Sequence, residues 1–389
     1  MRPVYLDHNA TTPLSPGVAA AMSPYLGGQY GNPLTAHRFG EGPRAAIDEA
    51  RDSVRTLLGA TDDFRVLFNS GATEGLNHAL KGLALASLSD GRVGARRRIV
   101  IGGLEHYAVS APARWLADAF GFEIVRVAPG RDGVIPADAF IDAVAAESTL
   151  VAALHWANNE LGTLQPVEQI GRHCREIGVP FVCDAVQAIG KAPTEDACSF
   201  ADVIALSAHK FYGPKGAGAL VVRDGIDLVP LLHGASQESG ERGGTHNVAG
   251  IVGLGAAALA AHSGRQQEVA RVAALRDALA DGIRGRIDRV HWNGGRAPVL
   301  PNTLNLSFEG CPSAALCAEM DRRGFAISAG AACDSGTAKP SKNLLAMGLS
   351  EGRALTSVRI SLGHDTTAID VQAAQAAFAD AVSTVRANN

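Results

Sequence analysis

A series of short apolar runs constrains the fold of this chain more than any other feature of its sequence. The runs are rich in β-branched residues and mostly apolar rather than alternating, and amphipathic stretches such as 110–119, 137–146 and 167–177 separate the earlier ones. Continuous apolar strands that are spaced by helices predict a mostly parallel sheet covered on both faces. The predicted strands are Arg65–Asn69, Arg98–Ile101, Glu123–Val127, Thr149–Leu154, Pro180–Cys183, Val203–Leu206 and Ala219–Val222.

After Val222 the pattern changes and predicts a smaller α+β lobe, as expected for 389 residues, which exceed the usual size of one domain. A helix from about 247 to 261 and a second helix to about 284 come first. The segment Gly253-Leu254-Gly255 resembles part of a dinucleotide fingerprint, but it lies inside a predicted helix, which favours close helix packing. The predicted strands of this lobe are Pro301–Phe308, Ala326–Ser328 and Val358–Leu362.

Composition and charge exclude several classes of function. Hydrophobic residues make up 47% of the chain, charged residues 19%, and the formal net charge is −4, so neither nucleic acid nor an anionic membrane is an expected partner. We find no signal peptide and no apolar run long enough to span a membrane, and we expect a cytoplasmic protein. No cysteine pair has metal-site spacing, so no metal is expected and most thiols should be buried.

Lys210 closes one of the predicted strands and enters a loop that contains glycines and a proline. In a parallel sheet, ligands bind beyond the carboxyl ends of the strands. Burial of an ammonium group is costly, whereas a neutral amine can form a Schiff base with a carbonyl, most often that of pyridoxal phosphate. From this segment alone, an ordinary surface lysine is the alternative interpretation.

Other polar groups follow the neighbouring strands. The turn 70–74 opens a helix whose N-terminus suits a phosphate, although a simple helix cap is equally consistent with it. His106 follows the next strand and can stack on a ring, act as acid or base, or be merely structural. Asp184 ends another strand and suits a pyridinium nitrogen, with a helix cap as its alternative. Together these groups favour a pyridoxal phosphate site.

Motifs along nearly the whole chain resemble those of cysteine desulfurases of the iron–sulfur-cluster and nitrogen-fixation type, within the class V aminotransferase superfamily. So many ordered matches make the resemblance specific. The matching segments are 5–13, 31–33 with His37, 70–74, 105–106, 158–163, 184–187, 207–218, 242–245, 328–333 and 357–363.

The resemblance implies an α/β fold like that of aspartate aminotransferase, with a mostly parallel seven-stranded sheet in a large domain and a smaller α+β domain. It implies an N-terminal segment at 1–15, a large domain at 16–258 and a small domain at 259–389. It also implies a homodimer that binds pyridoxal 5′-phosphate. The residues implied to hold this cofactor are Lys210 (by a Schiff base), Asp184 (ring nitrogen), Gln187 (ring hydroxyl), His106 (stacking), Asn159 (near the ring oxygen), and Ala72, Thr73, Ser207, His209 and the partner's Thr245 (phosphate).

The same resemblance gives Asn159 and Arg359 the substrate carboxylate, which a guanidinium group can bind through two parallel hydrogen bonds. Cys333 falls at the family's persulfide position, in a loop of small residues. Lys210 alone would license several reactions, whereas attack by the Cys333 thiolate on the sulfur of cysteine implies a cysteine desulfurase that passes sulfur to an acceptor protein. The alternatives are a selenocysteine lyase, a C–S lyase that releases sulfide, or a pyridoxal-binding scaffold of a sulfur-transfer assembly.

Several positions depart from the family pattern. Asp334 follows the thiol where Ser or Thr is more usual, and its charge would raise the thiol pKa. Ala235 and Ser236 stand where glycines are common, and Gly75 and Leu76 stand where a Ser-Asn pair is frequent. These departures leave the acceptor protein and the catalytic rate open.

Overall fold

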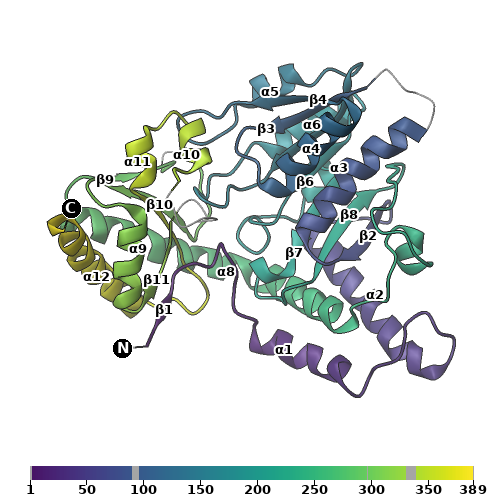
Figure 1. The fold of residues 1–389 in the computed structure, drawn as a ribbon. Helices are drawn as coiled ribbons and strands as arrows, with labels where there is room; N and C mark the ends of the chain where they lie inside the picture. Colours follow the sequence, from purple (N-terminus) through teal and green to yellow (C-terminus); the bar gives the residue numbers. More distant parts are fainter. Residues whose placement is uncertain (1, 90–95, 296, 330–338, 389) are drawn as a thin grey trace.

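The computed structural model of the protein describes residues 2–89, 96–295, 297–329 and 339–388 (Figure 1). Its large part is built on a seven-stranded sheet of order β2-β8-β7-β6-β5-β3-β4. Only β8 runs against the others, so the predicted mostly parallel sheet is confirmed. The strands are β2 (Phe64–Asn69), β3 (Arg98–Gly102), β4 (Glu123–Val127), β5 (Thr149–His155), β6 (Phe181–Asp184), β7 (Val203–Ser207) and β8 (Gly218–Arg223).

Helices cover both faces of this sheet, as the continuous apolar strands predict. Alternate strand residues enter two separate cores: Val66 and Val100 pack on one face, and Leu67 and Ile99 on the other. Helices α3 and α4 cover the second face, whereas α2, α6 and part of α8 cover the first. The helices of this part are α1 (Pro16–Met22), α2 (Arg38–Leu58), α3 (Ala72–Ser89), α4 (Tyr107–Phe120), α5 (Ala137–Ala143), α6 (Val167–Glu176), α7 (Ala197–Phe200) and α8 (Val248–Arg286), with short 3-10 turns η1 (Ser23–Leu26), η2 (Ala208–Lys210) and η3 (Gln237–Gly240).

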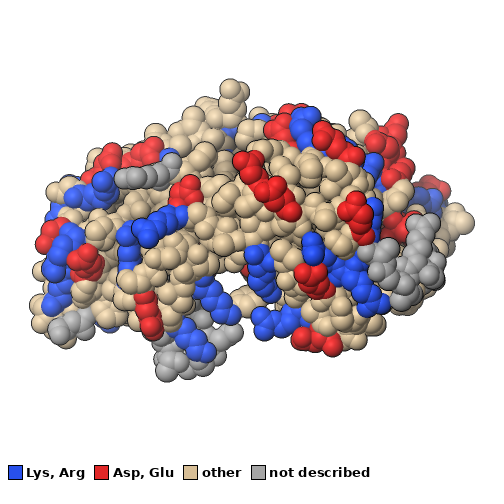
Figure 2. All heavy atoms as spheres, turned by 90° about the horizontal axis from the view of Figure 1, so that it is seen from above, with Lys and Arg blue, Asp and Glu red and all other residues tan. Residues whose placement is uncertain are grey.

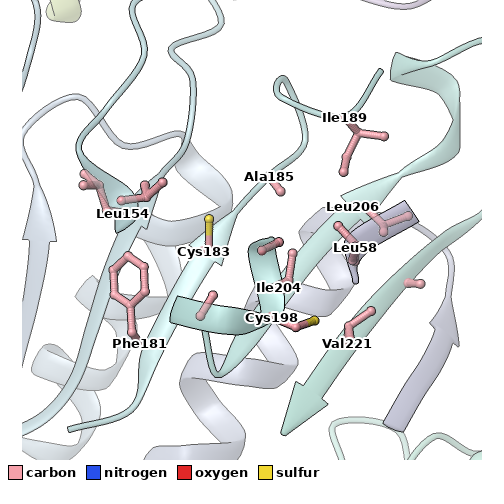
Figure 3. Close-up of a cluster of buried hydrophobic side chains, with 14 of the residues drawn as sticks. Leu58, Leu154, Phe181, Cys183, Ala185, Ile189, Cys198, Ile204, Leu206 and Val221 are labelled. Atoms are coloured by element: carbon pink, nitrogen blue, oxygen red, sulfur yellow. The ribbon is translucent and has the colours of Figure 1, made fainter. Parts of the chain in front are cut away.

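The core beneath the middle of the sheet is apolar throughout. Figure 3 shows Phe181 and Cys183 of β6 and Ile204 of β7 among aliphatic side chains, with Cys198 from α7 beside them. Cys174 lies in the same core. These three thiols are therefore buried, as the sequence predicts for most of the cysteines.

The smaller part is built on a four-stranded antiparallel sheet of order β12-β13-β10-β9. Strand β1, near the N-terminus, pairs in parallel with β11, and Asp7 bridges to Ser361 of β13. The elements are β1 (Val4–Tyr5), β9 (Val290–Trp292), β10 (Thr303–Phe308), α9 (Ser313–Arg322), β11 (Phe325–Ala326), β12 (Ser328–Ala329), α10 (Lys342–Ala346), α11 (Glu351–Leu355), β13 (Ser357–Ser361) and α12 (Ala368–Ala387).

Helix α8 connects the two parts and corrects the sequence prediction. The chain forms one helix of 39 residues where two helices are predicted. Gly255 lies against α2, where a Cβ would stand 2.6 Å from the Cα of Ala50, so the glycines serve close helix packing as predicted. The proposed domain boundary at 258/259 falls inside α8, and the division of the chain stays a prediction.

Two further structural facts bear on function. Within the described residues, no helix is long and apolar enough to cross a membrane. In the same part of the chain, no group of three or more His, Cys, Asp or Glu side chains is arranged to hold a metal ion.

Candidate active site

A cavity of about 460 Å³ lies beyond the carboxyl ends of the strands in the large sheet. Figure 2 shows the molecule hollowed between its two parts, with Lys and Arg side chains around the rim. Most of the predicted site residues line this one cavity: Ala72, Thr73, His106, Asn159, Asp184, Gln187, Ser207, His209 and Lys210.

Lys210 ends the 3-10 turn η2 directly after β7, so the strand delivers its side chain to the cavity. Its Nζ donates hydrogen bonds to the backbone oxygens of Asn9 (2.8 Å) and Ala10 (2.7 Å). Burial, and then the nearby Arg359 charge, lower the pKa of Lys210 to about 8. About a tenth of this amine is therefore neutral and nucleophilic at pH 7, far more than for an ordinary lysine.

Asp184 is the last residue of β6 and is 7% exposed. One of its oxygens accepts a hydrogen bond from the backbone nitrogen of Val186 (3.1 Å), so the predicted alternative of a helix cap accounts for part of its contacts. No ion pair within the described residues involves Asp184. Burial, and then the negative charge of Glu105, raise the pKa of Asp184. This carboxylate therefore has no direct contact with a cation, the kind of contact that stabilises a buried charge.

Gln187 is held between two groups that fix the orientation of its amide. Its Nε2 donates to the backbone oxygen of Asn9 (3.0 Å), and its Oε1 accepts from Nζ of Lys191 (3.0 Å). Because a lysine amine has only donors when charged, the amide oxygen must face Lys191. Burial, and then the charge of Lys210, lower the pKa of Lys191 to about 7.

The N-terminus of α3 forms another part of the cavity wall. Gly218 of β8 lies between β2 and β7, and a Cβ there would stand 2.5 Å from the Cα of Gly71. This close approach brings the turn before α3 next to Ser207. The side chain of Glu74 accepts from the backbone nitrogen of Ser70 (2.9 Å), so the predicted alternative of a cap is present here too, without closing the cavity.

Two histidines complete the lining. His106 caps α4, because its Nδ1 accepts from the backbone nitrogen of Ala108 (3.1 Å). His209 contacts the Thr11 hydroxyl through Nδ1 (3.1 Å). Burial, and then the charges of Lys210 and Lys215, lower the pKa of His209 to about 4, so its imidazole is neutral at physiological pH.

Two predicted residues are absent from the lining of this cavity, and a third lies outside the described residues. Arg359 lies beside the cavity, where it donates to Asp7 (2.6 Å) and to the backbone oxygen of Asn159 (3.1 Å). Thr245 of the same chain lines a neighbouring cavity of about 250 Å³. Cys333 lies outside the described residues.

Comparison with known proteins decides the family. The model for aminotransferase class V matches residues 4–374. The chain belongs to this family. A cysteine desulfurase IscS of Dictyoglomus turgidum is 39% identical over 95% of this chain and 92% of its own length, and an IscS-like cysteine desulfurase of Mycobacterium tuberculosis is 38% identical over 98% and 97%. A solved NifS-like protein superposes with a TM-score of 0.89 at 32% identity, covering 98% of this chain and 100% of that structure.

These relatives make the chain a cysteine desulfurase with pyridoxal 5′-phosphate as its cofactor, as the sequence predicts. The cavity fits this cofactor on three observations. Asp184 needs a cation, which a protonated pyridine ring supplies. Lys210 offers a partly neutral amine. The N-terminus of α3, together with Ser207 and His209, offers donors to a phosphate.

Sequence reasoning missed several residues around the cavity. Lys191 stands four residues after Gln187, and that spacing is the signal that could have found it. Asn9 lies in the family segment 5–13, whose sequence does not indicate that its backbone oxygen accepts from both Lys210 and Gln187. His155 and Glu105 form a buried pair at the cavity wall.

Proposed function

We propose that this chain converts L-cysteine to L-alanine, takes the sulfur on Cys333 as a persulfide, and passes it to an acceptor protein. The observation that carries the proposal is the joint presence in one cavity of an unpaired buried Asp184 and a strand-end Lys210 of lowered pKa. A related solved structure, described as SspA in complex with cysteine, is 35% identical with a TM-score of 0.78 and covers 92% of this chain and 98% of that one. The cysteine in that complex supports L-cysteine as the substrate.

The residues that would hold the cofactor follow from their positions. Lys210 would bind its carbonyl carbon, Asp184 its ring nitrogen and Gln187 its ring hydroxyl, with Asn159 near the same oxygen. His106 would stack on the ring. Ala72, Thr73, Ser207 and His209 would hold its phosphate, since all four line the cavity and the first backbone N–H groups of a helix are free to bind an anion. When bound, the cofactor serves as an electron sink for the carbon atoms of the substrate.

The protein's own groups have separate tasks. The neutral fraction of Lys210 can accept a proton from the substrate and return it. Arg359 would hold the substrate carboxylate together with Asn159: its Nη2 and Nη1 are engaged by Asp7 and Asn159, and its buried Nε has no partner among the described residues. This free donor supports the proposed role of Arg359.

The sulfur step balances without an external oxidant. The Cys333 thiolate attacks the sulfur of the substrate, an S–S bond forms, and the C–S bond breaks. The electron pair of the C–S bond stays with the substrate's β-carbon, which takes a proton and becomes the methyl group of alanine. Both sulfurs are oxidised by one electron each, and the β-carbon is reduced by two.

The described cysteines support Cys333 by elimination. None of the five lines the cavity. Burial raises the pKa of Cys174 and Cys198 to about 12 and that of Cys183 well above its ordinary value. Thiols of this kind carry almost no thiolate at neutral pH and are poor nucleophiles.

We further propose a homodimer in which the partner's Thr245 joins the phosphate site. Support comes from exposed apolar side chains between η1 and the first turn of α2, where Leu26 and Tyr30 are 74% and 76% exposed and Phe39 is 54% exposed. Exposed apolar patches of this kind mark interaction surfaces. Replacing both Leu26 and Tyr30 with Asp should convert a dimer into a monomer in sedimentation experiments and weaken cofactor binding. A wild-type monomer would overturn the proposal.

The cytoplasmic location stays a prediction. The pathway of the acceptor also stays a prediction: iron–sulfur cluster assembly, or thiolation of a cofactor, tRNA or metabolite.

Intact-mass analysis after exposure to L-cysteine tests the proposed function. The wild-type enzyme should gain one sulfur atom and release alanine. Cys333→Ser should retain the cofactor absorbance but gain no sulfur and release no alanine, whereas Cys311→Ser, a buried thiol of the small domain, should behave as wild type.

Other outcomes would separate the alternatives. Equal alanine formation by wild type and Cys333→Ser would mean a C–S lyase that releases free sulfide. Turnover of selenocysteine alone would mean a selenocysteine lyase. Cofactor absorbance with no turnover at all would favour a scaffold.

A further inference from the structure

A buried carboxylate and a buried imidazole lie next to Asp184 and have no part in the proposed mechanism so far. The side chain of Glu105 is fully buried and that of His155 is 5% exposed. Oε1 of Glu105 lies 2.7 Å from Nδ1 of His155 and also accepts from the backbone nitrogen of His155 (3.0 Å). Two contacts from one residue to the same oxygen fix the imidazole relative to the carboxylate.

The second ring nitrogen of His155 has no partner among the described residues. Nε2 is buried, and the other Glu105 oxygen, Oε2, is buried and unpaired as well. His155 ends β5 and is the register partner of Asp184 at the end of β6. Both residues line the active-site cavity. A buried imidazole nitrogen without a partner is rare, and at this place it borders the ligand site.

The charges around the His155 imidazole indicate its electrostatic role. Glu105 and Asp184 are two carboxylates close enough to affect each other, and the charge of Glu105 favours the protonated form of Asp184. An imidazolium next to both would offset that repulsion. Burial opposes a charge on His155, but the Glu105 carboxylate raises the pKa of His155 above its ordinary value.

We propose that His155, oriented by Glu105, is a positioning residue that carries a positive charge beside Asp184 and keeps that carboxylate ionised. The inference rests on the proposed role of Asp184 toward the cofactor's ring nitrogen. An ionised Asp184 binds a protonated pyridine ring as an ion pair, whereas a neutral Asp184 does not. The pair Glu105–His155 therefore sets the cofactor affinity and the protonation of the ring nitrogen.

Among the described residues, the charged groups that act on His155 are two carboxylates: Glu105 from the segment between β3 and α4, and Asp184 at the end of β6. His106 and Cys183 lie near the same carboxylates. The charge of Lys210 enters the cavity from η2. Of these groups, only Glu105 makes a direct hydrogen bond to the ring of His155.

A set of three variants separates this electrostatic role from a merely structural one. His155→Gln keeps a donor for Glu105 but cannot carry charge, so the charge of Glu105 acts on Asp184 without an offset. The dissociation constant of pyridoxal phosphate, measured by fluorescence titration of the full-length cofactor-free protein, should rise by about tenfold, because the uncompensated charge of Glu105 favours the neutral form of Asp184. Glu105→Gln alone should have a smaller effect.

The double variant Glu105→Gln with His155→Gln gives the decisive comparison. Because removal of both groups also removes the repulsion, the double variant should bind the cofactor more tightly than His155→Gln does. A structural role predicts the opposite, since a second buried change adds damage. Glu123→Gln, which removes an exposed carboxylate of β4, is the matched control and should bind as wild type.

The absorbance of the bound cofactor supplies a second readout. Its pH titration should shift in His155→Gln and return toward wild type in the double variant. Unchanged affinity and absorbance in His155→Gln, or a double variant weaker than the single one, would overturn the inference. If instead the wild-type protein binds no cofactor, the proposed function fails and this inference with it, so the two failures are distinguishable. Far-UV circular dichroism checks that each variant is folded.

Discussion

Two buried aspartates at opposite ends of the large sheet show that one residue type can support the fold at one end and a ligand site at the other. Asp202 precedes β7, next to the amino end of β6, and its side chain is 1% exposed. It pairs with Arg223 (2.8 Å) and Arg175 (3.3 Å) and accepts from the backbone nitrogen of Phe181 (2.9 Å). Asp184, at the carboxyl end of β6, has one backbone contact and no ion pair among the described residues.

The comparison separates a buried charge that stabilises the fold from a buried charge that is available to a ligand. The arginines satisfy Asp202 within the chain, so this carboxylate supports the fold. Asp184 costs folding free energy until the cofactor binds, because its carboxylate is buried and no cation makes direct contact with it among the described residues. The buried Lys210, Lys191 and Glu160 also have pKa values that are shifted toward their neutral forms.

The largest expected effect is the loss of catalytic activity in the Asp184→Asn variant. Turnover of L-cysteine should fall by about 1,000-fold, the effect of removing a key electrostatic group from an active site. Steady-state alanine formation measures it. The raised pKa of Asp184 means that its ionised form destabilises the cofactor-free protein as pH rises through that value. Asn should therefore leave cofactor-free stability at pH 7 unchanged or increased, and a clear loss would contradict the comparison.

Asp202→Asn should give the reverse pattern. Two arginines lose their charged partner, so the free energy of unfolding should fall by about 3 kcal/mol. Urea unfolding measures the loss, and cofactor affinity per folded molecule should stay at the wild-type value. The comparison would be contradicted if Asp202→Asn were as stable as wild type but had lost cofactor binding.

Glu160 sharpens the comparison through pH. Ser341 and Asn343 donate to its carboxyl group, but burial raises the pKa of Glu160 to about 7. The folded state therefore holds a proton that the unfolded chain has lost, and this contribution to stability is present below about pH 4.5 and disappears as pH rises through 7. Between pH 5 and 8, Glu160→Gln should gain stability relative to wild type by about 2 kcal/mol in urea unfolding. A constant difference across this range would mean that Glu160 does not titrate there.

Lys191→Met should have the smallest effect. It removes the donor that orients the Gln187 amide, and loss of one hydrogen bond should weaken cofactor binding by about two- to tenfold. The lowered pKa of Lys191 means that its charged form destabilises the fold as pH falls through about 7, so Met should help most at pH 6. Lys191→Arg, which keeps donors, is the matched control. Wild-type affinity in Lys191→Met would show that Gln187 needs no support.

The sequence was sufficient for the large sheet because most of its strands are buried on both faces and are therefore mostly apolar. All seven predicted runs are strands in the structure, including the edge strand β4, whose Glu123 and Arg126 are exposed. The small part was harder. The single predicted strand Ala326–Ser328 is two strands, β11 and β12, because the chain leaves its pairing with β1 and joins β13. Strand β9 was missed, since its three residues are only partly buried.

In the site, the sequence predicts residues that lie next to an apolar run but not pairs that only the fold brings together. Asp184 and Lys210 could be predicted because each directly follows an apolar run. The pair Glu105–His155 could not, because its partners are 50 residues apart and meet only through the order of β3 and β5 in the sheet. The contact of Arg359 with Asp7 joins residues 352 positions apart and was missed for the same reason.

The central claim is that Asp184 is a charge kept for the cofactor's ring nitrogen. Nitrogen NMR of pyridoxal phosphate labelled at that atom, bound to wild type, Asp184→Asn and Asp202→Asn near pH 7.5, tests it directly. We predict a protonated ring nitrogen in wild type and in Asp202→Asn, and an unprotonated one in Asp184→Asn. The same chemical shift in all three proteins would contradict the account.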